Sequence, residues 1–190
     1  MHPVKRLLLI RHCESMGQAA DAPLSERGHE QARALARDLA LQPIDRVISS
    51  PFLRAQQTIE PFVQQVGLAL EFDARLVEKT LSREPIPSWR EEVQRSFVDF
   101  EHTLPGGESS REAQARGRAA LDAALAAGHT LPALVSHGQL MSLILHSIDP
   151  AFGFDEWARL ANPDVFVVEG ATGGSPLRFR RLALPSRRMV

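Results

Sequence analysis

The sequence predicts an α/β protein with three layers, α/β/α, around a mainly parallel central sheet. Short apolar runs alternate with longer amphipathic stretches along most of the chain, as in sheets whose strands are joined by helices. Only the last two apolar runs follow each other without a helix between them. No repeat or linker divides the chain, and its 190 residues suit one domain covering 1–190.

The first half of the chain predicts two strands, each followed by a helix. Lys5–Ile10 and Arg46–Ser49 are short apolar runs of the length that buried strands have. After a polar loop, Ser25 is suited to cap a helix that runs to about Leu41. A second helix is predicted over Leu53–Val66.

Proline and glycine set the boundaries of the next segments. Pro61 lies inside the second helix and predicts a kink or a break there, and Gly67 is suited to end that helix. The stretch Leu68–Val77 is predicted to be extended. The two prolines within Leu81–Pro87 indicate a loop.

Two capping boxes predict helices in the second half. In each, a serine is followed three residues later by a glutamate, which is the pattern of reciprocal capping. Ser88 and Glu91 predict a helix that ends at about Thr103. Ser109 and Glu112 predict a helix that ends at Ala127.

The remaining elements are two more strand segments and a helix. Pro132–Ser136 is predicted as a strand, and a helix follows His137-Gly138 through Ile148. The last two predicted strands are Val165–Val168 and Leu177–Leu184, and we expect them to form a hairpin. The glycines in the connection between them are Gly170, Gly173 and Gly174.

Composition excludes several classes of function. The formal net charge is -1, so we expect no nucleic-acid partner and no membrane partner. No apolar run approaches the ~20 residues of a membrane span, and the single cysteine, Cys13, excludes an internal disulfide. We therefore expect a cytoplasmic protein. The basic residues near the end are interpreted as a solvated strand and terminus: Arg178, Arg180, Arg181, Arg187 and Arg188.

Three polar clusters follow three of the predicted strands. They are Arg11-His12, Ser49 to Arg54, and Ser136-His137-Gly138. Because sheets of this class place their sites beyond the carboxyl ends of the strands, we expect the three clusters to meet in one crevice.

The clusters suit the transfer of a phosphoryl group. The charge on the phosphoryl oxygens must be held through the transition state, and the forked guanidinium groups of Arg11 and Arg54 do this well. His137 adds a donor, as do backbone N–H groups at Gly138, where a helix begins. A neutral imidazole at His12 can then attack phosphorus in line.

With these clusters the sequence resembles the histidine phosphatase superfamily, which is also called the phosphoglycerate mutase-like family. That family has an Arg-His-Gly motif after its first strand, and four further blocks match in the same order. The five blocks are Leu8-Leu9-Ile10-Arg11-His12-Cys13-Glu14-Ser15, Leu24-Ser25-Glu26-Arg27-Gly28 with Gln31-Ala32, Ser49-Ser50-Pro51-Phe52-Leu53-Arg54-Ala55-Gln56-Gln57-Thr58, Pro105-Gly106-Gly107-Glu108-Ser109 and Val135-Ser136-His137-Gly138.

The resemblance implies a role for each matching residue. His12 becomes the phosphohistidine, and Arg11, Arg54 and His137 hold the phosphate, as Gln18 and Gly138 are expected to do. Glu78 occupies the place of the proton donor. No metal and no cofactor are implied, and the expected partner is a small phosphorylated molecule.

Three departures from the family pattern stand out. Cys13 replaces the usual glycine, which narrows the backbone freedom beside the nucleophile, and Gln18 replaces an asparagine. After Glu78 the usual block rich in glycine and aromatic residues is absent. Glu14 and Glu108 are therefore kept as alternative acids, and the substrate is expected to be unusual for the family.

Cysteine-based catalysis is a separate possibility that the spacing excludes. A His-Cys pair also begins the loop of the cysteine-dependent phosphatases, where an arginine must follow six residues after the cysteine. That position is Ala19 here.

The sequence thus predicts a phosphomonoesterase that works through a phosphohistidine at His12. The chain has little room for a large lid, and a mutase must shield its phosphohistidine from water, so a mutase is the second hypothesis. A non-catalytic domain that binds a phosphorylated ligand is the third. The sequence carries no signal of oligomeric state.

Overall fold

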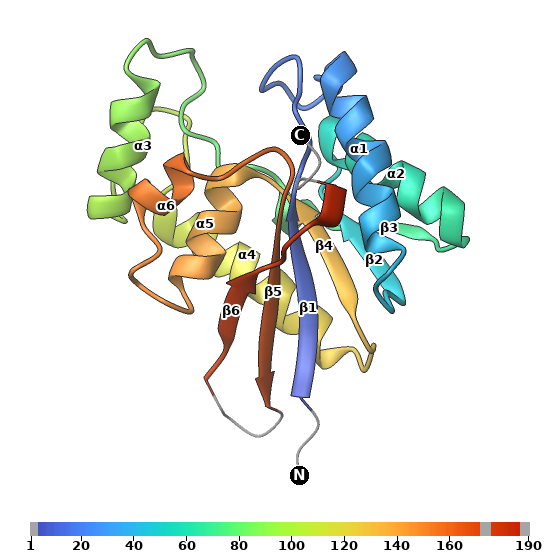
Figure 1. The fold of residues 1–190 in the computed structure, drawn as a ribbon. Helices are drawn as coiled ribbons and strands as arrows, with labels where there is room; N and C mark the ends of the chain where they lie inside the picture. The colour runs from blue at the N-terminus through green and yellow to red at the C-terminus, as the bar shows by residue number, and fades with distance from the viewer. Residues whose placement is uncertain (1–3, 172–175, 187–190) are drawn as a thin grey trace.

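The computed structural model describes residues 4–171 and 176–186, and a six-stranded sheet forms its centre (Figure 1). The strands are β1 (Val4–Arg11), β2 (Arg46–Ser49), β3 (Leu70–Phe72), β4 (Pro132–Ser136), β5 (Asp164–Ala171) and β6 (Arg178–Arg181). Their order across the sheet is β3-β2-β4-β1-β5-β6. The first four of these are parallel, whereas β5 runs antiparallel to both β1 and β6, so the mainly parallel sheet is confirmed.

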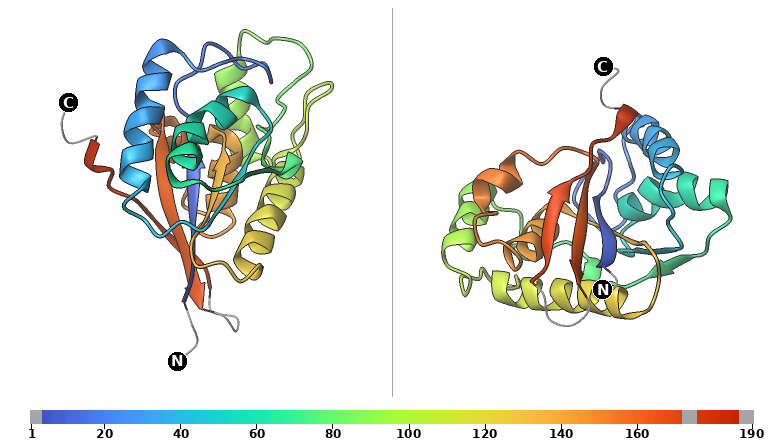
Figure 2. Two further views of the ribbon diagram at one scale, coloured as in Figure 1. Left: turned by 90° about the vertical axis from the view of Figure 1, so that its right-hand side faces the viewer. Right: turned by 60° about the horizontal axis from the view of Figure 1, so that its bottom comes forward.

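Helices cover both faces of the sheet, which confirms the three-layer arrangement (Figures 1 and 2). On one face lie α1 (Glu26–Leu39) and α2 (Leu53–Val66), and on the other lie α4 (Ser110–Ala126) and α5 (Gly138–His146). Two shorter helices, α3 (Trp89–Val98) and α6 (Phe154–Ala158), lie beside α5 at the end of the molecule away from α1 and α2.

Alternate residues of β1 supply two separate cores. Leu8 and Ile10 pack with the apolar faces of α1 and α2, whereas Leu7 and Leu9 pack with α4 and α5. All four are at most 1% exposed. Because successive side chains of a strand point to opposite faces, a continuous apolar run is what a strand covered on both sides requires.

Several helix boundaries match the predictions from the sequence. Ser25 accepts a hydrogen bond from the backbone N–H of Gly28, as an N-cap does. Gly67 ends α2 with a φ of 74°, a left-handed conformation that favours glycine. The capping box of Ser109 and Glu112 is present at the start of α4. Helix α2 continues through Pro61, so the alternative of a break there is wrong.

The first predicted capping box, at Ser88, is wrong. Ser88 has a ψ of 28° instead of the extended backbone of an N-cap, and its side chain makes no capping bond. The helix also ends at Val98 rather than about Thr103. The chain turns there because the carbonyl of Phe100 accepts from the backbone N–H of Arg111, which draws this segment toward the start of α4.

The stretch Leu68–Val77 is extended over only part of its length. Its strand is β3, and a single 3₁₀ turn over Ala74–Leu76 follows. The side chain of Asp73 accepts from the backbone N–H of Arg75 and so begins that turn. Helix α6 was not predicted, because its five residues are too few to show a period.

The C-terminal hairpin of β5 and β6 is confirmed, although β6 ends at Arg181 rather than Leu184. Two of its arginines are paired: Arg178 Nε lies 3.0 Å from Glu169, and Arg181 lies 3.0 Å from Asp164. Gly173, Gly174, Arg187 and Arg188 lie outside the described residues. Within 4–171 and 176–186, no helix has the length and apolar character needed to cross a membrane.

Candidate active site

The two histidines meet because β1 and β4 are parallel neighbours at the centre of the sheet. Arg11 pairs in register with Ser136, so His12 and His137 are the next residues of their chains at the same sheet edge. The backbone N–H of His12 donates to the carbonyl of Ser136 over 3.0 Å. The two imidazole rings lie 5.1 Å apart between centroids. The structure therefore brings together two residues that are 125 positions apart in the sequence.

Arg54 reaches the same place from the first turn of α2. Its Nε lies 3.3 Å from Nε2 of His12, and its Nη1 donates to the backbone carbonyls of Gln18 and Ala19 over 3.1 and 2.7 Å. The side chain is completely buried. These contacts of Nε and Nη1 fix the orientation of the guanidinium group beside His12.

The surroundings of His12 favour one neutral form of its ring. Nδ1 lies 2.6 Å from the carbonyl oxygen of Cys13, which only accepts, so Nδ1 carries the hydrogen. The lone pair then lies on Nε2, which faces Arg54. Burial, helped by the positive charges of Arg54 and Arg11, lowers the pKa of His12 to about 3, although the Cys13 carbonyl acts in the opposite direction. The imidazole is therefore neutral near pH 7.

Side chains from α1, from α2 and from the segment before β5 fix the backbone on both sides of this ring. The N–H of Cys13 donates to Oγ1 of Thr58 over 2.8 Å, and the N–H of Glu14 donates to Oε1 of Gln31 over 2.9 Å. The side-chain amide of Asn162 donates to the carbonyl of His12 over 2.7 Å. These contacts hold the loop after β1 in place.

The cysteine that replaces the family's glycine fits without strain. Cys13 does not have a positive φ, and its side chain is completely buried in the core beneath α1 and α2. The backbone at this position therefore does not need the freedom of glycine.

Arg11 lies on the other side of the site, against the start of α5. Its Nη1 donates to the carbonyl of Leu160 over 2.9 Å. A Cβ atom at Gly138 would lie 3.1 Å from three atoms of the Arg11 guanidinium group, so glycine gives this group its space. Nε of Arg11 is buried and has no hydrogen-bond partner among the described residues. It is a donor available to an anion.

His137 presents a second buried nitrogen without a partner among the described residues. Its Nε2 lies 2.8 Å from Oγ of Ser50, which also accepts from the N–H of Phe52. Burial, with the nearby positive charges, lowers the pKa of His137 well below its usual value, so the ring is neutral. A hydroxyl hydrogen of Ser50 directed to Nε2 leaves the ring hydrogen on Nδ1. Nδ1 is buried and has no partner among the described residues.

Glu78 lies at the start of α5 and caps that helix from outside. Its carboxylate accepts from the backbone N–H groups of Gln139 and Leu140 over 3.1 and 2.9 Å. These amides belong to the first turn, whose N–H groups have no partner inside the helix. Two of the backbone donors at this helix start thus go to Glu78.

The negative charge of Glu78 also acts on the two arginines of the site. Burial lowers the pKa of both Arg11 and Arg54, and the negative charge of Glu78 raises both. The two alternative acids are occupied elsewhere. Glu14 accepts from the hydroxyl of Ser25 over 2.7 Å, and Glu108 accepts from Arg116. Of the three, Glu78 is the one whose charge acts on both arginines.

Gln18 contributes its backbone rather than its amide in this structure. Its carbonyl accepts from Arg54, and its side chain is exposed. Three residues that contact the site were not singled out from the sequence: Ser50, Asn162 and Arg116. Ser50 lies inside a recognised block, which is a usable signal, whereas Asn162 and Arg116 lie in segments with no motif.

Comparison with protein families gives a match over most of the chain. The family model of the Histidine phosphatase superfamily (branch 1) matches residues 7–180. Among curated proteins, a probable phosphoglycerate mutase GpmB from Yersinia pestis (strain Pestoides F) is 34% identical over 162 residues, which are 75% of this chain and 74% of that protein.

Solved structures with the same fold include both phosphatases and a mutase. A mycobacterial glucosyl-3-phosphoglycerate phosphatase has a TM-score of 0.77 and 24% identity, with 94% of this chain and 97% of that chain covered. A phosphoglycerate mutase from Bacillus anthracis str. Sterne has a TM-score of 0.74 and 18% identity, with 95% and 93% covered. At such identities these likenesses speak for the fold alone.

Proposed function

Because the chain belongs to the histidine phosphatase superfamily, we propose that it is a phosphomonoesterase that forms a phosphohistidine at His12. The observation that carries this proposal is the state of the His12 ring. It is neutral, its Nδ1 hydrogen is held by the Cys13 carbonyl, and its Nε2 lone pair faces Arg54. A nucleophile needs such an unprotonated ring nitrogen at neutral pH.

In this proposal the phosphate of the substrate is bound between Arg11, Arg54 and His137. Nε of Arg11 and Nδ1 of His137 are the two buried donors described above, and they suit the oxygens of a phosphoryl group. A phosphate oxygen also replaces Nε2 of His12 as the acceptor for Arg54. The lone pair of His12 is then released toward phosphorus.

The transfer has two steps. Nε2 of His12 attacks phosphorus, the bond to the ester oxygen breaks, and a protonated Glu78 gives its proton to the leaving alcohol. The oxygen of a water molecule then attacks phosphorus while Glu78 takes a proton from that water. The bond between phosphorus and Nε2 breaks, its electron pair returns to His12, and inorganic phosphate leaves. The arginines and His137 stabilise the charge on the phosphoryl oxygens in both steps.

Water is the proposed acceptor because the segments beside the site are short. Between Glu78 and Pro105 the chain forms one ten-residue helix, α3, and two loops, and the described side chains there are largely exposed. A mutase has to keep water away from its phosphohistidine, which requires a closed cover.

The direct test is hydrolysis of an aryl phosphate by the purified protein. We expect release of inorganic phosphate by the wild type and its loss on His12→Ala. The control is His29→Ala, an exposed histidine on α1. A phosphoprotein that is labile in acid and stable in base would identify the phosphohistidine. Unchanged turnover by His12→Ala would refute the mechanism, and binding of phosphate without turnover would favour a non-catalytic domain.

A phosphomutase is the second candidate, because relatives that are 34% identical are described as probable phosphoglycerate mutases. Incubation with a phosphoglycerate, followed by ³¹P NMR, separates the two activities. A mutase converts one phosphoglycerate into another, whereas the proposed phosphatase releases inorganic phosphate.

A further inference from the structure

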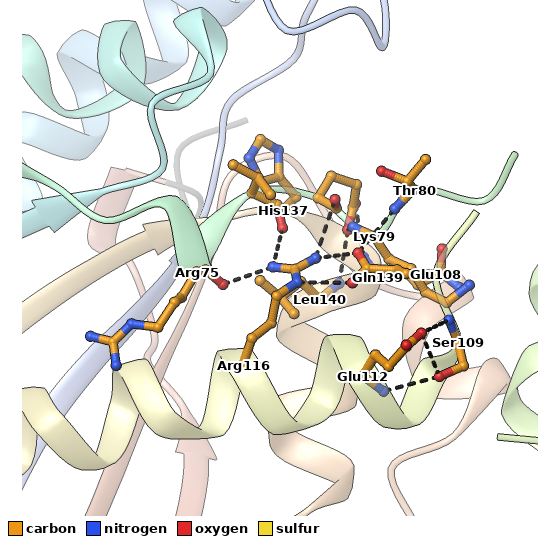
Figure 3. Close-up of polar contacts among 12 residues, drawn as sticks. Arg75, Lys79, Thr80, Glu108, Ser109, Glu112, Arg116, His137, Gln139 and Leu140 are labelled. Atoms are coloured by element: carbon orange, nitrogen blue, oxygen red, sulfur yellow. Dashed lines mark hydrogen bonds and ion pairs between the residues drawn. The ribbon is translucent and has the colours of Figure 1, made fainter. Parts of the chain in front are cut away.

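Arg116 of α4 reaches out of its helix into the segment that carries Glu78 (Figure 3). Its Nη1 donates to the backbone carbonyls of Arg75 and Val77 over 2.7 and 2.8 Å. Its Nη2 lies 3.4 Å from the carbonyl of Glu78 itself. One guanidinium group therefore binds three backbone carbonyls within four consecutive residues, 75–78. This stretch begins in the 3₁₀ turn and continues without regular secondary structure.

A carboxylate holds Arg116 in this position. Nε of Arg116 donates to Oε2 of Glu108 over 3.0 Å, and Oε1 of Glu108 accepts from the backbone N–H of Thr80 over 3.2 Å. The N–H of Glu108 in turn donates to the carbonyl of Thr80 over 2.9 Å. Arg116 and Glu108 thus join the segment on both sides of Glu78 to helix α4.

The side chain of Glu78 is fixed at its other end by helix α5. Its carboxylate accepts from the N–H groups of Gln139 and Leu140, while its backbone is held by Arg116. The two attachments come from different helices. They determine where the carboxyl group lies relative to Arg11 and Arg54.

We propose that Arg116 is a positioning residue for the proton donor Glu78, and that its ion pair with Glu108 is part of the same function. The inference rests on the proposed function, in which Glu78 protonates the leaving alcohol. Arginine suits this task because its five N–H donors form a rigid fork that serves carbonyls and a carboxylate at once. A lysine has the charge but not the fork.

The test uses the dependence of kcat/KM on the leaving group. An alkyl phosphate needs its leaving oxygen protonated, whereas a nitrophenyl phosphate has a leaving group that departs without a proton. We expect Glu78→Gln to lose roughly 100-fold on the alkyl ester and little on the nitrophenyl ester. Arg116→Ala should show the same selectivity, with a loss of roughly tenfold or more on the alkyl ester alone.

Two further variants control for a general loss of structure. Arg118→Ala removes another arginine of α4, one that pairs with Asp122 on the surface, and we expect it to leave both esters unaffected. Arg116→Lys keeps the charge without the fork and should fall between the wild type and Arg116→Ala. If the role of Arg116 were merely structural, Arg116→Ala would lower kcat/KM equally for the two esters.

A second readout does not depend on activity. The carboxylate of Glu78 protects the amides of Gln139 and Leu140, so we expect Arg116→Ala to speed their hydrogen exchange relative to the rest of α5. Unchanged exchange at these amides overturns the inference. The inference is also overturned if Glu78→Gln loses kcat/KM selectively on the alkyl ester and Arg116→Ala does not. The proposed phosphatase activity would survive that result. Should the wild type hydrolyse no ester, the proposed function fails, and amide exchange alone decides the role of Arg116.

Discussion

The two sides of the site are built in different ways. On the side proposed to bind phosphate, here called the phosphate side, His12 and His137 directly follow two paired central strands, so the sheet itself sets their spacing. On the side proposed to supply the acid, here called the acid side, Glu78 lies in an irregular segment held by the Arg116 side chain of α4 and by amides of α5. The first arrangement is rigid because strand register has no intermediate positions. The second depends on a few contacts that a single substitution removes.

This difference predicts two kinds of defect. Changes on the phosphate side should weaken the transfer from every ester, because every substrate presents the same phosphoryl group. Changes on the acid side should depend on the leaving group. The following experiments test the first half of this comparison, and the leaving-group series described for Arg116 tests the second.

The largest effect is expected for Arg54→Ala. This change removes the guanidinium group that contacts His12 and the loop after β1. It also removes the positive charge that is proposed to stabilise the phosphoryl oxygens. We expect kcat/KM to fall by roughly 10³-fold for both alkyl and aryl esters. Arg37→Ala, on the exposed face of α1, is the matched control. A loss confined to one class of ester would break the comparison.

Gly138→Ala should cause a smaller loss that is again the same for all esters. The new methyl group would lie 3.1 Å from the guanidinium group of Arg11 and would displace it. A shift of this kind costs up to roughly 100-fold in kcat/KM. Gly153→Ala is the control, because the nearest atom to its Cβ is 3.9 Å away. Full activity of Gly138→Ala would show that the close contact with Arg11 is unimportant.

Ser50→Ala should reduce kcat/KM by roughly tenfold, mainly through KM, because a buried hydrogen bond to His137 is lost. The ring of His137 should also lose its preference for a hydrogen on Nδ1. Long-range ¹H–¹⁵N correlation spectra distinguish the two tautomers directly. A wild-type spectrum with the hydrogen on Nε2 would contradict the assignment made from the contacts of Ser50.

The smallest expected effect concerns stability at low pH. The pKa of His12 falls from an ordinary 6.5 to about 3 on folding, so the unfolded chain binds the proton first. The free energy of unfolding should therefore decrease as the pH falls from about 6.5 toward 3. From pH 6.5 to 5.5, His12 alone contributes about 1 kcal/mol of this decrease.

Chemical denaturation of the wild type and of His12→Gln at both pH values isolates this contribution. The variant cannot take up the proton at this position, so its stability should change less over the interval. An identical change in the two proteins would mean that His12 is not held neutral by the fold. Phosphate buffers should be avoided, because phosphate binding would itself stabilise the folded state.

The sequence predicted the arrangement around the two histidines better than the arrangement around Glu78, for a physical reason. Arg11, His12 and His137 follow strands whose apolar runs are visible in the sequence, so the sheet places them. Nothing local to Glu78 shows that Arg116, far along the chain, holds it. The predicted capping box at Ser88 failed for a similar reason, since the pattern of residues was present and the backbone angle was not.

Position 13 shows how a departure from a family pattern is best judged. The absence of glycine there predicted a narrower range of backbone conformations beside His12. The backbone of Cys13 has no positive φ, and its buried side chain fills part of the core. Only the three-dimensional structure tells whether a glycine in relatives serves the backbone or simply leaves space.

The central place of β1 in the sheet has a consequence for how the protein is made. β1 is synthesised before the other five strands of this sheet, yet its two neighbours, β4 and β5, come only after β2 and β3. Leu7 and Leu9, which pack with α4 and α5, therefore remain without these partners until both helices have been made, and contacts of such long range form slowly. No fragment that ends before β4 can assemble the pair of histidines, because His137 follows that strand.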